Sequence, residues 1–245
     1  MSRRVRQPFV VLAVLAALVG GVACLDLPER DHRVSAGPGV EVITIRATDD
    51  RPLDARLWPR DRKRLVLYLH GYQRTQRDWW PEAAAGAPGE PSALTLDLRG
   101  HGDSGGDHDD FELMAGDVRT VLAFARVRGY ERVAIVGAGI GGTVAALVAR
   151  DEPGVSVVGL SLPADFADLE ALEACAAIGP RLTIVAARED LSARESLDQI
   201  TRNARLEPSR ALLLPGRAHG IALLRGESAE ATRRVTKEAL DRAWR

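Results

Sequence analysis

The chain has 245 residues, of which 46% are hydrophobic and 27% are charged, and its formal net charge at pH 7 is −1. This length suits one α/β domain. A charge near zero with no long run of one sign excludes a general affinity for polyanions, so we expect no nucleic-acid partner.

The first 24 residues have the pattern of an export signal. Three arginines precede an apolar run, residues 8–24, that contains no charged side chain. The run is shorter than the about 20 residues that span a bilayer, and it lacks an amphipathic period. It ends in Gly21-Val22-Ala23-Cys24, which resembles a bacterial lipobox, where small residues precede a cysteine that receives lipid. A signal peptide or lipoprotein signal is therefore predicted for residues 1–24.

This resemblance implies a location outside the cytoplasm in a bacterial cell envelope, with Cys24 as the lipid-modified residue. Two alternatives stay open, namely simple cleavage without lipid and an uncleaved membrane anchor. In each anchored case the membrane is contacted through the N-terminus. Residues 25–39 mix proline, glycine and charge without periodicity and are predicted to be a linker, followed by one domain over residues 40–245.

Within residues 40–245, short apolar runs alternate with longer helical patterns, which is typical of a mostly parallel sheet with helices on both faces. The first two runs are predicted to form a hairpin, and the later ones are compact and apolar, as buried parallel strands are. The sequence predicts about eight strands, at residues 40–47, 52–58, 64–69, 93–98, 132–136, 155–160, 182–186 and 211–214. Helices are predicted at residues 111–128, 140–149, 165–177, 192–204 and 227–244.

The strand at residues 132–136 leads into Gly137-Ala138-Gly139-Ile140-Gly141-Gly142. A strand, a sharp glycine turn and a helix in this order are typical of a nucleophile elbow, so the segment resembles that of the α/β-hydrolase superfamily. The family pattern is Gly-x-Ser-x-Gly, and here Gly139 stands in place of the serine. The same residues also fit G-x-G-x-x-G, but a dinucleotide fold has this motif on the first strand of its unit.

Further segments match the hydrolase pattern in the expected order. His70-Gly71-Tyr72 follows the third strand, and Asp97-Leu98-Arg99-Gly100-His101-Gly102-Asp103-Ser104 follows the fourth. The resemblance implies an α/β-hydrolase fold for the whole domain. It also implies that Asp190 is the triad acid, His219 the triad base, and the backbone N–H groups of Tyr72 and Ile140 the oxyanion hole.

A glycine at position 139 has no atom that can attack a carbonyl, so an acyl-enzyme cannot form there. Ser161 and Ser104 are the alternative nucleophiles, but strand-end and turn-shaping roles are the simpler interpretations of these two serines. A water activated by His219 is a further alternative. Glu189 competes with Asp190 for the acid position, and Asp190 has a second interpretation as the N-cap of the following helix.

Only about twenty residues, 162–181, separate the sixth and seventh strands, and we expect one helix there and no large lid. The sequence thus predicts a membrane-associated, extracytoplasmic protein of hydrolase fold that lacks serine catalysis and binds an unknown small-molecule or protein ligand. The alternative is an active hydrolase of ester or peptide substrates that uses an unconventional nucleophile or a His219-activated water. We predict no cofactor and no metal.

Overall fold

The computed structural model describes residues 39–245. The predicted signal at residues 1–24, with Cys24, and the linker up to residue 38 lie outside the described residues. In the described part of the chain, no helix combines the length and the apolar character needed to cross a lipid bilayer.

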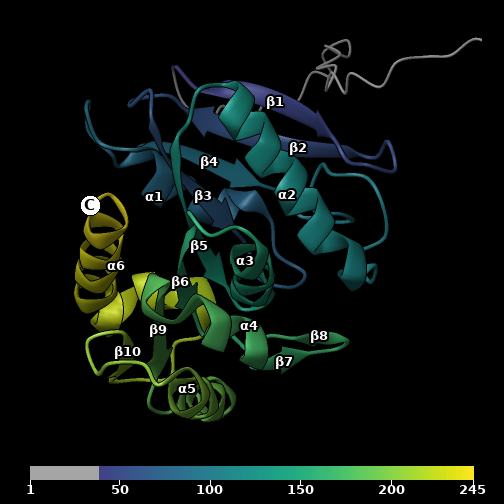
Figure 1. The fold of residues 1–245 in the computed structure, drawn as a ribbon. Coiled ribbons are helices and arrows are strands. Elements are labelled where there is room, and N and C mark those ends of the chain that lie inside the picture. The colour runs from purple at the N-terminus through teal and green to yellow at the C-terminus, as the bar shows by residue number, and fades with distance from the viewer. Residues whose placement is uncertain (1–38) are drawn as a thin grey trace, which may run out of the picture.

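A central sheet of eight strands carries the fold (Figure 1). The strand order is β1-β2-β4-β3-β5-β6-β9-β10; β1 pairs antiparallel with β2 and β2 with β4, while all later neighbours are parallel. The strands are β1 (Glu41–Arg46), β2 (Pro52–Trp58), β3 (Arg64–Leu69), β4 (Ser92–Leu96), β5 (Arg132–Ala138), β6 (Ser156–Leu160), β9 (Leu182–Ala187) and β10 (Ala211–Leu214). The predicted mostly parallel sheet with an N-terminal hairpin is therefore confirmed.

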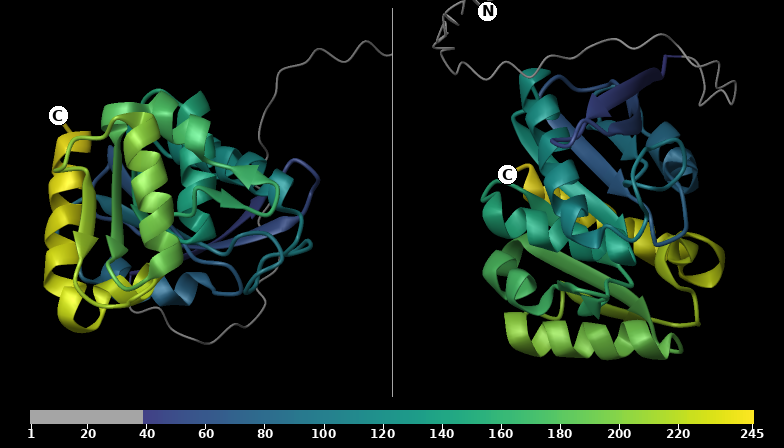
Figure 2. Two further views of the ribbon diagram at one scale, coloured as in Figure 1. Left: turned by 90° about the horizontal axis from the view of Figure 1, so that it is seen from below. Right: turned by 90° about the vertical axis from the view of Figure 1, so that its right-hand side faces the viewer.

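Helices cover both faces of the sheet, as Figure 2 shows. One layer contains α2 (Phe111–Val127), α3 (Ile140–Asp151), α4 (Leu172–Ile178) and α5 (Leu191–Ala204). The opposite face packs against α1 (Trp80–Ala84) and α6 (Ala229–Ala243), with short 3-10 turns at Gln76–Trp79 and Gly220–Leu224.

Alternation along β3 explains why a parallel strand must be apolar throughout. Leu65, Leu67 and Leu69 are fully buried under the α2–α3 layer, whereas Val66 and Tyr68 pack on the α6 side. Successive side chains of a strand point to opposite faces, so a sheet covered on both sides needs apolar residues at every position. The periodicity of the sequence therefore predicts these strands correctly.

The segment at residues 162–181 departs from the prediction. Instead of one helix over 165–177, it forms a two-stranded hairpin, β7 (Asp165–Phe166) and β8 (Leu169–Glu170), before the shorter helix α4. The ring of Phe166 lies 5.4 Å from the ring of Tyr72 and 5.4 Å from that of Phe111. These contacts with distant parts of the chain favour a hairpin, and local periodicity does not record them. The other predicted elements match the observed ones to within two residues at each end.

The backbone is closely packed where α3 begins. A Cβ on Gly141 would lie 2.6 Å from the carbonyl oxygens of Leu69 and His70 at the end of β3. A Cβ on Gly137 would clash with the backbone of Gly141 itself. Only glycine therefore allows β3, β5 and α3 to approach one another this closely.

We expect Gly141→Ala to lower the free energy of unfolding by about 1 to 3 kcal/mol or more, because the added methyl group meets backbone atoms that cannot rotate away. Gly116→Ala is the matched control, since a Cβ at Gly116 in α2 meets nothing within 4 Å. That control should gain about 0.5 to 1 kcal/mol through helix propensity. Urea unfolding of both variants measures the difference, and equal effects would contradict this account of the packing.

Candidate active site

Gly139 forms the turn between β5 and α3. Its backbone angles are φ 51° and ψ −126°, and its N–H donates to the carbonyl of Leu160 at 2.9 Å. A residue with a side chain is strained in this conformation, whereas glycine adopts it freely. A Cβ placed on Gly139 would have only two neighbours, Gly71 Cα and His219 Nε2, each at 3.8 Å. These are ordinary contacts, so the space for a serine side chain is present and faces the histidine.

The structure brings Asp190 and His219 together beside this turn. The Nδ1 atom of His219 lies 2.7 Å from Oδ2 of Asp190. The imidazole is 60% exposed and the carboxylate 10% exposed. With the proton on Nδ1, that nitrogen donates to the carboxylate and Nε2 faces Gly139, the orientation that a catalytic base requires. Glu189, the competing acid, lies instead 3.6 Å from Arg217.

Asp190 uses its two carboxylate oxygens in different contacts, one at the start of α5 and one with His219. Its Oδ1 atom accepts from the N–H of Ala193 at 3.5 Å and from the hydroxyl of Ser192 at 3.3 Å, which is an N-cap of α5. Its Oδ2 atom faces His219. The cap fixes the carboxylate with one oxygen and leaves the other for the imidazole.

Ser161 contacts both Asp190 and the loop that carries His219. The sequence pattern indicates only that this serine lies at the end of a strand. Its hydroxyl accepts from the N–H of Gly220 at 2.9 Å and lies 3.4 Å from Oδ2 of Asp190. The residue is 1% exposed and has a φ of 50°. Because its oxygen is buried and already bonded, Ser161 is a poor nucleophile, and it links the histidine loop to the acid.

Tyr72 and Ile140 both line the cleft over Gly139. Within residues 39–245 the backbone N–H of neither residue donates a hydrogen bond to another protein atom. The first N–H groups of a helix have no intrahelical acceptor, which explains why that of Ile140 is available. An oxyanion hole is built from unbonded donors of this kind.

His70 holds the turn before Tyr72. Its Nε2 accepts from the N–H of Leu98 at 3.0 Å, so Nδ1 carries the proton and donates to the carbonyl of Gly71 at 2.7 Å. Burial lowers the pKa of His70 from 6.5 to about 4. A neutral imidazole therefore holds the backbone turn that leads to Tyr72.

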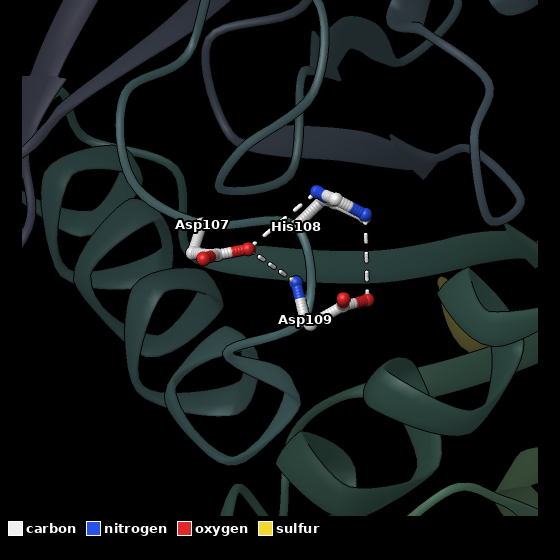
Figure 3. Close-up of side chains that lie close together, drawn as sticks. All are labelled: Asp107, His108 and Asp109. Carbon is white, nitrogen blue, oxygen red and sulfur yellow. Dashed lines mark hydrogen bonds and ion pairs between the residues drawn. The ribbon is translucent and has the colours of Figure 1, made fainter.

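The phenol of Tyr72 is fixed from the loop that precedes α2. Its hydroxyl donates to Oδ1 of Asp109 at 2.9 Å. Figure 3 shows Asp107 and Asp109 on either side of His108. Each carboxylate lies 3.5 Å from one ring nitrogen of His108. The N–H of Asp109 donates to the carboxylate of Asp107 at 3.1 Å. Each of these three residues has a side-chain atom of a type that can bind a metal ion, and these atoms lie within 4.8 Å of one another. The sequence pattern did not indicate this arrangement. The three side chains are exposed and contact one another. Asp109 also holds the hydroxyl of Tyr72.

A buried polar network supports the same turns from below. The carboxylate of Asp97 accepts from the N–H groups of Gln76 at 2.7 Å and Asp103 at 3.0 Å, and so joins the loops after β3 and β4. Asp54 shares the Gln76 amide with Asp97, and burial raises the pKa of its carboxyl. The hydroxyl of Ser104 accepts from the N–H of Asp54 at 2.8 Å and donates to the carbonyl of Asp97 at 2.6 Å. Ser104 therefore shapes this turn.

A cleft of about 760 Å³ lies over Gly139 and His219. Its apolar wall includes Phe166 of the β7–β8 hairpin, and its polar wall includes Glu195 and Gln199 of α5. This volume is in the range of small-molecule sites, and the mixed lining suits a ligand with an apolar and a polar part.

The buried imidazole predicts a pH effect on stability. The pKa of His70 is lower in the folded protein than in the unfolded chain, so the neutral imidazole contributes fully to the free energy of unfolding above pH 6.5. This contribution is lost as the pH falls from 6.5 toward 4. Between pH 7 and 4.5 the wild type should lose roughly 2 to 3 kcal/mol more than His70→Gln, which carries no charge at any pH. Urea unfolding at both pH values gives the comparison. Parallel losses in the two proteins would show that His70 is not held neutral.

Several solved structures are similar to this fold. The Pyrococcus furiosus esterase Pf2001 superposes with a TM-score of 0.66 at 17% identity, covering 83% of this chain and 90% of the esterase. A hydrolase from Novosphingobium aromaticivorans gives 0.63 at 17% identity, covering 81% and 98%. A membrane phospholipase A, a bacterial virulence factor, gives 0.60 at 15% identity, covering 84% and 87%. At these identities the likeness shows the fold.

Among curated proteins, none matches the sequence. The sequence model of the Alpha/beta hydrolase family, in contrast, matches residues 66–245, which is most of the chain and includes the elbow, the acid and the histidine. This agrees with the order of the strands and with the turn at Gly139. The chain belongs to the alpha/beta hydrolase family.

Proposed function

We propose that this protein is a membrane-associated, extracytoplasmic member of the family that binds a small ligand in the cleft over Gly139 and forms no acyl-enzyme. The observation that carries the proposal is Gly139 itself, which occupies the elbow with no side chain beside a paired Asp190 and His219. Removal of a triad nucleophile costs on the order of 10⁶ in rate. The remaining groups are suited to binding.

The ligand that fits best contains an acyl or carboxylate group. The N–H groups of Tyr72 and Ile140 offer two donors to one oxygen, and Nε2 of His219 faces the space where a second oxygen would lie. An esterase and a phospholipase A are among the similar structures, which supports an acyl-containing ligand for the same cleft. The aromatic and aliphatic wall would contact the rest of the molecule.

A second candidate is slow hydrolysis by a water that His219 activates. It is favoured by one observation, the open position beside Gly139 that lies 3.8 Å from Nε2. A water there would have a base beside it and two donors for the oxyanion. Ester or peptide substrates would suit this chemistry.

Gly139→Ser should create esterase activity, because the added hydroxyl would lie within reach of Nε2 of His219. Against p-nitrophenyl acetate we expect a rate on the order of 10²-fold or more above that of the parent, less than the about 10⁶ of a mature triad. The variant should lose about 1 to 3 kcal/mol of stability, since serine is strained at a positive φ. A fluorophosphonate probe should label the new serine.

The parent protein and Gly139→Ser/His219→Ala are the controls. The parent should resist the probe and hydrolyse the ester no faster than His219→Ala. Labelling of the parent at any serine would remove the proposal, and a parent rate that depends on His219 without labelling would favour the activated water. A folded Gly139→Ser protein that neither reacts nor hydrolyses would refute the site assignment.

Membrane attachment is proposed to occur through a lipid on Cys24, which is supported by the apolar run before it and the small residues at positions 21–23. Carbonate extraction of membranes from a bacterial host provides the test. Wild type should stay with the membrane and Cys24→Ser should be released, because one apolar run of this length binds weakly without lipid. A Cys24→Ser protein that resists extraction would indicate an uncleaved helix.

A further inference from the structure

A second cavity lies at the opposite edge of the sheet from Gly139. Its volume is about 110 Å³, and it is enclosed by the amino ends of β5, β6 and β9 and by the last turn of α6. Three arginines, Arg181, Arg210 and Arg242, contribute to its wall together with Ser156 and Thr183. In a parallel sheet the carboxyl ends of the strands carry the candidate active site, so this cavity is separate from it.

These three arginines are half-buried, and unlike the buried arginines of the fold they form no ion pair with a carboxylate in the described residues. Within residues 39–245, no carboxylate lies within 4.0 Å of Arg181, Arg210 or Arg242. By comparison, Arg99 lies 2.7 Å from Asp117, and Arg56 lies 2.6 Å from Asp54. Three like charges around one small space repel one another unless a counter-charge enters it.

The three guanidinium groups differ in the hydrogen bonds that they donate. Arg181 donates to the carbonyls of Ala149 and Val155 at 3.1 and 2.5 Å and so caps the end of α3. Arg242 donates through Nη2 to the hydroxyl of Thr183 at 3.3 Å, while its Nε is buried with no partner. The guanidinium of Arg210 donates no hydrogen bond within the described part of the chain. A buried donor without an acceptor is costly, which points to an acceptor supplied from outside.

Electrostatics agree with this geometry. Burial lowers the pKa of Arg210 and the neighbouring charge of Arg242 lowers it further, whereas the carboxylate of Glu207 raises it by a smaller amount. An anion between the two guanidinium groups would offset both lowering effects on Arg210, because it favours the charged form.

We propose that this cavity binds one small dianionic oxyanion, such as inorganic phosphate, between Arg210 and Arg242. Guanidinium groups hold tetrahedral oxyanions through paired N–H donors, and two cations that form no ion pair in the described residues match a dianion. The cavity has room for a free ion of five heavy atoms.

The test is thermal unfolding of the full chain in phosphate and in chloride at equal ionic strength. At a phosphate concentration ten times Kd, Tm should rise by about 3 to 6 °C. Arg210→Gln/Arg242→Gln should lose this rise. Arg126→Gln should keep it, because Arg126 is exposed and already paired with Glu152 at 2.5 Å.

Arg210→Gln alone serves as the test variant if the double variant does not fold. This substitution removes no side-chain hydrogen bond of the described chain. Without phosphate it should be at least as stable as wild type, because repulsion is relieved, and its phosphate response should fall at least ten-fold in apparent affinity. Two results would overturn the proposal: a full response in Arg210→Gln, or an equal response of the wild type to chloride.

Discussion

The close approach of β3, β5 and α3 is the constraint on which the rest of the site depends. Gly141 lies so near the carbonyls of Leu69 and His70 that no side chain fits between them. This contact forces the chain to turn sharply at Gly139, and the turn brings the first N–H of α3 to the edge of the sheet. The first N–H of α3, the turn at Gly139 and this part of the cleft wall all lie beside that one packing contact.

Shared polar groups then connect the loops around that turn. Asp190 caps α5 with one oxygen and faces His219 with the other, while Ser161 joins the same carboxylate to Gly220. Asp97 joins the loops after β3 and β4 in the same way. Each of these carboxylates therefore has a structural role that does not depend on a side chain at position 139.

Charge is distributed differently at the two edges of the sheet. At the carboxyl edge, Arg74 and His219 line the cleft and each has a carboxylate partner, Asp78 and Asp190 respectively. At the amino edge, Arg210 and Arg242 line one small cavity and form no such ion pair in the described chain. The cationic side chains at the two edges thus differ in how far their charge is balanced.

The sequence by itself determined the strands, most of the helices and the order of the motifs, because apolar periodicity and glycine turns are local properties. The resemblance of its motifs to the hydrolase pattern also singled out Gly139, Asp190 and His219, and the carboxyl edge of the parallel sheet brings these three residues close together. Only the tertiary structure decided the hairpin that holds Phe166 and the cavity beside Arg210. Both depend on contacts between segments far apart in the chain, and neither a ring-to-ring contact nor a missing counter-charge leaves a periodic trace in the sequence.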